Sequence, residues 1–316
     1  MNYKKIIGAF FAIGALTTVS SCGNDSKEKQ APNTIKYVDA NGEEVEFVAE
    51  KTDDFVEAHK AAEVLYYIQD SNQEIKTKNE SYTGYRLESD IYMKMKMKVD
   101  GVNTTTKIIA ESDLKYDMNT YQFEGDIYTK QVTSAGGYSL TAIIDGTEKG
   151  GIVNDEYLIL LDGKSSVKMP GYSDKSDVKY YSYYDGSRSM IDSYNLDNAF
   201  DNLLNAKDYI ITKTTKNTIT FGFDKDNFIF PINNPGTNTS EQQVNSNFYD
   251  DVIFEVTFDT NTFLPTNIYY EIDSSLVVNG YTTSIEMENN FDISFDVFNV
   301  NNTLDTTGYE LLPQQV

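Results

Sequence analysis

The sequence predicts an α+β protein whose main element is a large, curved antiparallel β-sheet, with an N-terminal helix and a short second helix. Long segments alternate between apolar and polar residues with a period of two, which is typical of strands covered on one face. Only two segments show the helical period of apolar residues. The 316 residues are 40% hydrophobic and 13% aromatic, which favours a folded chain over a disordered one.

The first 21 residues are expected to be a lipoprotein signal peptide. Lys4 and Lys5 precede an apolar run from Ile6 to about Leu16, shorter than the ~20 residues of a membrane-spanning helix. The following Val19-Ser20-Ser21-Cys22 resembles the lipobox of bacterial lipoproteins. The resemblance implies diacylation of the Cys22 thiol and cleavage before it; an ordinary signal peptide with an accidental cysteine is the alternative. We therefore expect lipid anchoring on the outer side of the cell membrane, or in the outer membrane.

The body of the chain follows a short linker. Residues 22–33 are small and polar and predict a flexible tether. Residues 34–316 are expected to form a single β-rich domain. Within it, the segment 232–247 is rich in Asn, Ser, Thr and Gly and is interpreted as a long loop, with a domain boundary as the alternative. The net charge is −23 for the whole chain and −25 once residues 1–21, with their two lysines and no acid, are removed. An anionic bilayer therefore repels this body, so the acyl chains on Cys22 must hold it there.

Local signals near the start of the domain predict a hairpin and a helix. Asn41-Gly42 lies between two short apolar-alternating segments, 35–38 and 45–48, as in a tight hairpin. Thr52 can cap a helix that begins soon after it. Apolar residues then recur at helical spacing, at Phe55, Ala58, Ala62 and Leu65. A shorter apolar-periodic segment, 196–206, predicts the second helix.

The remaining segments predict strands. Residues 87–99 alternate almost without interruption, as do residues 285–297, in which Val297 is expected on the apolar face. Shorter alternating segments cover 252–258 and 268–272. Turns are predicted at four Asp-Gly or Asn-Gly pairs, which begin at Asp100, Asp145, Asp162 and Asn279. Strands of ~13 residues must coil as the sheet twists. Because two helices are too few to cover such a sheet, it must curl on itself or leave apolar surface facing a cavity.

This order of elements resembles that of the Lol-type lipoprotein carriers and the mycobacterial lipid-carrying lipoproteins. The local segment closest to them is Val256-Thr257-Phe258-Asp259-Thr260-Asn261-Thr262-Phe263-Leu264-Pro265, in which a strand ends in Asp, turns and restarts after Leu-Pro. The resemblance implies a half-barrel-like sheet with helices as a lid and a cavity that holds acyl chains. The segment 232–247 has no obvious counterpart in those families.

The expected function is therefore non-catalytic binding of an apolar ligand, such as lipid, on the concave face of the sheet. Methionine suits surfaces that adapt to varied apolar ligands. Six residues are predicted to line the binding face: Ile91, Met93, Met95, Met97, Phe254 and Val256. Ordinary sheet core is the alternative for the methionines. On the opposite face of the same strand, the lysines at 94, 96 and 98 are expected to be solvated, or else to dock an acidic partner.

Two rival functions stay open. A tyrosine cluster at 180, 181, 183 and 184, near Tyr172 and Tyr194, favours a surface module that binds protein or glycan. Abundant carboxylates alone suggest a hydrolase, and we expect no enzyme. One His and one Cys argue against His-rich or Cys-rich metal sites, and no cofactor or metal is expected. With two arginines and a strongly acidic chain, nucleic acid is not expected as a partner, and the sequence identifies no protein partner.

Overall fold

The computed structural model describes residues 33–39, 41–99, 101–154, 156–184, 209–223, 250–278 and 281–312. The predicted signal peptide, nearly all of the tether with Cys22, the predicted helix over 196–206 and the loop 232–247 lie outside the described residues. Every statement below about the structure concerns the described part of the chain.

A small hairpin and two helices precede the main sheet. Strands β1 (Asn33–Val38) and β2 (Glu44–Ala49) are antiparallel, which confirms the predicted hairpin. Helix α2 (Phe55–Ser71) confirms the first predicted helix, and Thr52 Oγ1 accepts a hydrogen bond from the Asp54 N–H just ahead of it. Helix α3 (Gln73–Asn79) follows directly and was not predicted; the side chain of Asn72 caps its first N–H groups.

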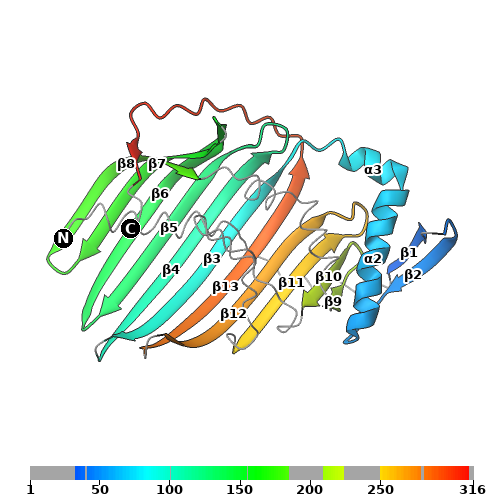
Figure 1. Cartoon of the computed structure of the whole chain (residues 1–316), viewed down its shortest axis with the longest axis horizontal. Helices are drawn as coiled ribbons and strands as arrows, with labels where there is room; N and C mark the ends of the chain where they lie inside the picture. The colour runs from blue at the N-terminus through cyan, green and yellow to red at the C-terminus, as the bar shows by residue number, and fades with distance from the viewer. Residues whose placement is uncertain are drawn as a thin grey trace.

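The described residues form one open sheet of 12 strands beside the separate hairpin (Figure 1). Its strands are β3 (Gly84–Val99), β4 (Val102–Asp117), β5 (Gln122–Ala135), β6 (Tyr138–Val153), β7 (Glu156–Met169), β8 (Tyr172–Tyr184), β9 (Tyr209–Thr214), β10 (Thr218–Phe223), β11 (Asp251–Asp259), β12 (Pro265–Val278), β13 (Tyr281–Asp296) and β14 (Glu310–Leu311). Their order in space is β14-β8-β7-β6-β5-β4-β3-β13-β12-β11-β10-β9. The predicted large antiparallel sheet is thus confirmed.

Two antiparallel meanders make up this sheet. Strands β3 to β8 follow one another in sequence and in space, and so do β9 to β13. The two meanders meet where β3 pairs with β13 over almost the full length of both strands, from Gly84↔Asp296 to Met97↔Thr283. We call this junction the seam. The sequence predicts both seam strands but carries no local signal that they pair, because the pairing is non-local.

Two predicted turns are wrong. Asp145-Gly146 and Asp162-Gly163 lie inside β6 and β7, where Gly146 and Gly163 are directly opposite each other. A Cβ at Gly146 would lie 2.5 Å from the carbonyl oxygen of Asp162, so the two backbones approach more closely than side chains allow. The glycines here permit close strand contact instead of chain reversal. The other two predicted pairs come between antiparallel partners, β3 with β4 and β12 with β13, but Asp100 and residues 279–280 lie outside the described residues.

The end of β13 also differs from the prediction. The strand ends at Asp296, and the side chain of Val297 is 65% exposed instead of lying on the apolar face. From there the chain crosses the ends of the neighbouring strands. The backbone N–H of Val300 donates to Asp117, and the N–H of Asn302 donates to Gln122. Strand β14 then pairs with β8, and this is the parallel pair of the described sheet.

Helix α2 covers one end of the sheet. Its small and branched residues Ala58, Ala61, Leu65 and Ile68 are at most 3% exposed and form a core with side chains of β9, β10 and β11. Alanine allows the helix axis to approach the strands closely. Figure 1 shows α2 and the β1–β2 hairpin beyond β9, at the end of the sheet opposite β8. Helix α2 therefore packs at the β9 end of the sheet and not across the seam strands.

Candidate ligand-binding face

Strand alternation divides the side chains between two faces of the sheet. We call the face that carries Leu87, Ile91 and Met93 the inner face, and the face that carries Arg86 and Lys94 the outer face. The continuous antiparallel register extends this division from β3 to every strand from β12 to β8. Apolar residues dominate the inner face and ionisable residues dominate the outer one.

The predicted methionine stripe lies at the seam. Met93 is paired with Met287 on β13 and with Ile108 on β4, and Met95 is paired with Ile285. The three methionines of β3, at 93, 95 and 97, are half-buried. A fourth methionine thus joins the stripe from a strand far away in the sequence, a contribution that the sequence pattern alone did not predict.

The other three predicted lining residues lie in different surroundings. Ile91 is 5% exposed and belongs to the buried layer of the inner face. Phe254 is half-buried and stacks on Tyr270, with ring centroids 6.3 Å apart. Val256 is 6% exposed and belongs to the buried cluster that also includes residues of α2, β9 and β10. Phe254 packs both against the cluster that contains Val256 and against a second cluster, Val252 and Ile272, which Met287 also contacts.

A row of stacked aromatic rings borders the inner face at one end of the strands. Tyr85 stacks on Tyr116 at 4.8 Å, Tyr116 on Phe123 at 5.3 Å, and Phe123 on Tyr157 at 6.1 Å. The row runs from β3 across β4 and β5 to β7. It passes over β6 at Gly150, where a Cβ would lie 2.3 Å from the ring of Phe123. Glycine at this position lets the ring of Phe123 reach Tyr157.

Next to this row, the inner face carries an acid that the sequence analysis missed. Glu148 on β6 lies directly opposite Gly125 on β5 and Leu161 on β7. Desolvation raises the pKa of its carboxyl group to about 7. The sequence did carry a signal for this acid, because the alternation of β6 places Glu148 on the same face as Ala142 and Ile144. An acid in register with buried apolar residues is a stronger candidate for a functional group than a surface acid is.

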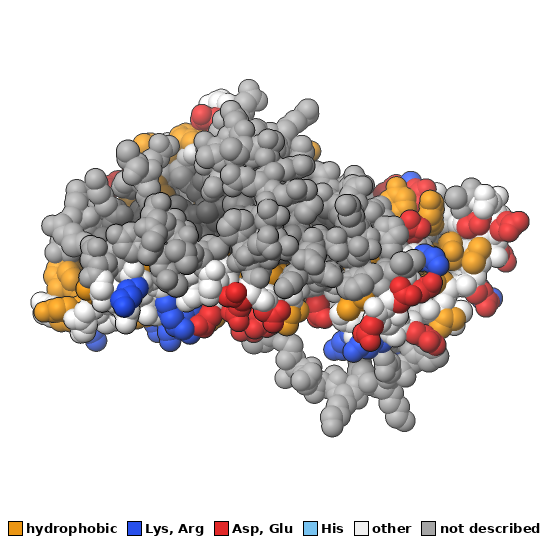
Figure 2. Space-filling model, turned by 60° about the horizontal axis from the view of Figure 1, so that its bottom comes forward, with side chains coloured by type: hydrophobic (Ala, Val, Ile, Leu, Met, Phe, Trp, Pro, Cys, Tyr) orange, Lys and Arg blue, Asp and Glu red, His pale blue; other side chains and the backbone are white. Residues whose placement is uncertain are grey.

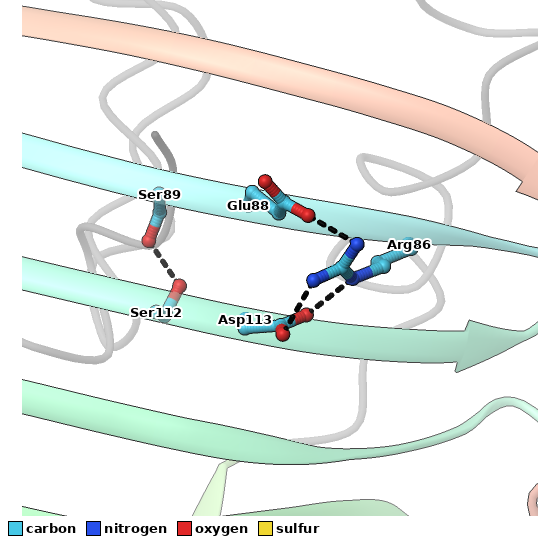
Figure 3. A network of polar contacts seen from close by, with 5 residues as sticks. All are labelled: Arg86, Glu88, Ser89, Ser112 and Asp113. Atoms are coloured by element: carbon cyan, nitrogen blue, oxygen red, sulfur yellow. Dashed lines mark hydrogen bonds and ion pairs between the residues drawn. The ribbon is translucent and has the colours of Figure 1, made fainter. Parts of the chain in front are cut away.

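The outer face holds its strands together with ion pairs (Figure 3). Arg86 donates from Nε and Nη2 to the two carboxylate oxygens of Asp113, each at 2.7 Å, and it also pairs with Glu88. These bonds raise the pKa of the guanidinium group and lower the pKa of Asp113. On the inner face of the same two strands, the hydroxyl groups of Ser89 and Ser112 are hydrogen bonded to each other. The network cross-links β3 and β4 from both sides.

The three outer-face lysines of β3, at 94, 96 and 98, are partly neutralised by an acid. Lys94 and Lys96 both bind the carboxylate of Glu286 across the seam, and these bonds lower its pKa to about 2. Lys98 is exposed. Where described side chains are visible in Figure 2, basic and acidic groups lie close together along the lower edge of the surface. The view therefore gives no support to a purely basic docking strip.

The tyrosine cluster is divided by the alternation of β8. Tyr181 and Tyr183 lie on the outer face with their rings edge to face at 5.6 Å, and Tyr183 is 39% exposed. Tyr180 and Tyr172 are half-buried on the inner face, where they pack against a core of β6 to β8. Tyr194 lies outside the described residues. The described tyrosines thus form no single patch on one face.

Neither a metal site nor a membrane-spanning helix is found in the described ranges. No group of three or more His, Cys, Asp or Glu side chains there has the arrangement of a metal site. No described helix is both long and apolar enough to span a bilayer.

Comparison with known proteins gives distant structural similarities. No family model and no curated protein matches the chain. The translocator domain of the autotransporter NalP from Neisseria meningitidis matches 74% of this chain and 97% of its own, with 8% identity and a TM-score of 0.26. A β-barrel-like DUF1849 protein from Brucella abortus covers 67% of this chain and 98% of its own, at 7% identity and a TM-score of 0.24. A DUF1329 family protein from Desulfovibrio piger covers 82% and 100%, at 11% identity and a TM-score of 0.19. These scores assign the chain to no fold family.

Proposed function

We propose that this protein is an extracytoplasmic lipoprotein, anchored through acyl chains on Cys22, that binds an apolar ligand such as a lipid on the inner face of its sheet. It would act by binding and not by catalysis. Its partners would be the membrane that holds the acyl chains and the apolar ligand itself. A half-barrel-like curvature of the sheet, with the inner face concave, is part of this proposal.

One observation carries the proposal: the methionine stripe at the seam is apolar yet only half-buried. Met93, Met95 and Met287 come from two paired strands and make one continuous surface. Among the described elements, α2 packs against β9 and the β1–β2 hairpin. Strand β9 lies at the end of the β9–β13 meander that is farthest from the seam. Half-buried thioether side chains can rearrange around ligands of different shape. Each ligand methylene that they remove from water contributes about 0.8 kcal/mol.

The test is lipid recovery from the purified protein combined with a charge placed on the stripe. Native mass spectrometry and organic extraction should recover an apolar molecule from the wild-type chain, and Met93→Lys should reduce its amount severalfold. Ile109→Lys is the matched control, because Ile109 lies on the adjacent strand but on the outer face, where it is 39% exposed. Equal recovery from both variants, or no apolar molecule from the wild type, would refute ligand binding at the stripe.

The anchor has its own test. Cys22→Ser should abolish labelling by a radioactive fatty acid and release the protein from the membrane fraction, because the thiol accepts the diacylglyceryl group. Continued labelling of this variant would contradict the lipobox assignment. The anchor and the binding face are independent, so either part of the proposal can fail alone.

A further inference from the structure

Charged residues are unevenly distributed along strands β3 to β8. A cross-strand row that runs from Tyr92 on β3 through Ile109 to Lys175 on β8 divides these strands into two halves. We call the half that contains this row and ends in the β3–β4, β5–β6 and β7–β8 turns the hairpin rim. Its described strand residues include one acid, Asp174, and seven lysines, at 94, 96, 98, 107, 130, 168 and 175. The other half has five basic residues, at 86, 115, 149, 164 and 179, and twelve acids, at 88, 90, 111, 113, 117, 124, 126, 145, 148, 156, 162 and 177.

Most lysines of the hairpin rim are not neutralised by acids. Lys94 and Lys96 share the carboxylate of Glu286 on β13. Four others are exposed on the outer face and form no ion pair within the described residues: Lys98, Lys107, Lys168 and Lys175. Lys107 even lies directly opposite Lys94, and like charges in this position destabilise a sheet. The rim therefore presents positive charge that the fold itself does not use.

Exposed apolar side chains lie at the tips of the same hairpins. Tyr138, the first residue of β6, is 71% exposed, the highest value among the large apolar side chains of the described chain. Val102, the first residue of β4, is 44% exposed. The turns themselves are short and contain glycines with positive φ, at 101, 136, 137 and 171. Tyrosine combines an apolar ring with a polar hydroxyl group and is enriched where lipid meets water.

The opposite ends of these strands differ in cover as well as in charge. The C-terminal segment crosses them, with the N–H of Val300 bonded to Asp117 and the N–H of Asn302 bonded to Gln122. Figure 1 shows this segment along the upper ends of the strands, with the three hairpin tips at the lower ends. The acidic ends are therefore partly covered by the chain, whereas Tyr138 and Val102 at the basic ends are exposed.

We propose that the hairpin rim contacts the surface of an anionic lipid bilayer, with its lysines on the lipid phosphates and Tyr138 and Val102 among the head groups. The acidic half then points away from the bilayer, which reduces the repulsion expected from a net charge of −23. The inference rests on the proposed function, because the acyl chains on Cys22 would keep the rim near the lipid, and it adds the orientation of the body. A basic patch is a common second membrane signal beside a lipid anchor.

Sedimentation with lipid vesicles tests the contact without the anchor. The full-length chain with Cys22→Ser, which lacks the acylated thiol, should bind vesicles of equal parts phosphatidylcholine and phosphatidylglycerol more tightly than vesicles of phosphatidylcholine alone. In this background, Lys107→Gln combined with Lys168→Gln should weaken binding to the anionic vesicles at least about tenfold, because one lysine near such a surface contributes about fivefold. The matched control is Lys115→Gln with Lys164→Gln, the same change of charge at exposed lysines of the acidic half, and it should not weaken binding.

The apolar part of the contact has a separate control. Tyr138→Ser should weaken binding to the anionic vesicles severalfold, whereas Tyr121→Ser, 52% exposed at the opposite end of the strands, should not. Residues 1–21 are identical in all variants, so differences among them belong to the rim. Raising the salt concentration should release the chain with unchanged rim residues, a measurement that needs no further substitution.

The possible outcomes separate this inference from the lipid anchor. Equal binding to the two kinds of vesicle, or equal loss in the rim and control lysine variants, would overturn the rim contact and leave the anchor at Cys22 untouched. Loss in the lysine variant without loss in Tyr138→Ser would overturn the bilayer as the partner and indicate a soluble polyanion. If Cys22→Ser fails to abolish fatty-acid labelling but the vesicle results are as expected, the anchor is wrong and the rim contact stands.

Discussion

Arg86 on β3 and Asp113 on β4 form a bidentate pair, with two parallel hydrogen bonds of 2.7 Å, and Asp113 lies directly opposite Glu88 in the strand register. Without the guanidinium group, two carboxylates would face each other across the β3–β4 pair. The arginine therefore both joins the two strands and removes a like-charge repulsion.

Replacing this arginine should weaken the β3–β4 pair measurably. Arg86→Ala should lower the free energy of unfolding by about 1 kcal/mol, a modest value because both partners are about four tenths exposed and water screens the pair. Arg86→Lys should recover only part of this, because lysine cannot make the two parallel bonds. Urea denaturation of Arg86→Ala, Asp113→Ala and the double variant measures the coupling. Additive single changes would show that the pair contributes nothing.

Adding one methyl group at Gly150 should disrupt the aromatic row. In Gly150→Ala the new Cβ would lie 2.3 Å from the ring of Phe123, so the ring must move away from Tyr157. We expect a loss of about 1–3 kcal/mol in unfolding free energy, as for other overpacked cores. Phe123→Leu in the same chain should relieve part of this loss. Two changes that simply add would argue against the ring contact.

Leu114 is a buried inner-face residue of β4, two positions before Tyr116 of the aromatic row. Its side chain is fully buried, so Leu114→Ala should lower the free energy of unfolding by about 2–5 kcal/mol. Ile109→Ala, on the outer face of the same strand, should cost much less because Ile109 is 39% exposed. Chemical denaturation of both variants gives the comparison. Equal losses would contradict the assignment of the two faces.

Acid should destabilise the seam through Glu286. Lys94 and Lys96 lower its pKa in the folded chain from 4.5 to about 2, so the unfolded state binds protons first as the pH falls. The contribution of Glu286 to stability is therefore complete above about pH 4.5 and is lost between that value and about pH 2. Glu286→Gln should be less stable than wild type at neutral pH, and the difference should shrink to zero across this window. Urea midpoints at several pH values test this; a difference independent of pH would exclude the ion pairs as its source.

Elements with a local apolar period were predictable from the sequence, whereas features that depend on strand pairing were not. Strands β3 and β13 and helix α2 were predictable because one face of each is apolar with a clear period. The pairs Asp145-Gly146 and Asp162-Gly163 were misread because Asp-Gly favours tight turns, while the apolar alternation of β6 and β7 continues through them. Two glycines that face each other across strands are recognisable only once the register is known.

The same limit applies to the binding face. The methionines of β3 were visible in the alternation, but Met287 joins them through the seam, which no local pattern specifies. Val256 has the alternation of a lining residue, yet it lies in the buried cluster that includes residues of α2. Glu148 could have been noticed as an acid on the apolar face of β6, although its glycine surroundings come from three strands.

The seam also sets the order in which the chain can assemble. Strands β3 to β8 form successive hairpins of neighbouring sequence and can pair as they are synthesised, whereas Lys94 and Glu286 are 192 positions apart. Contacts of such high sequence separation form slowly. Until β13 arrives, the long edge of β3 has no partner on that side and can pair with another chain. Variants that delay the β3–β13 pairing should therefore lower the yield of soluble protein more than they lower the stability of the finished fold.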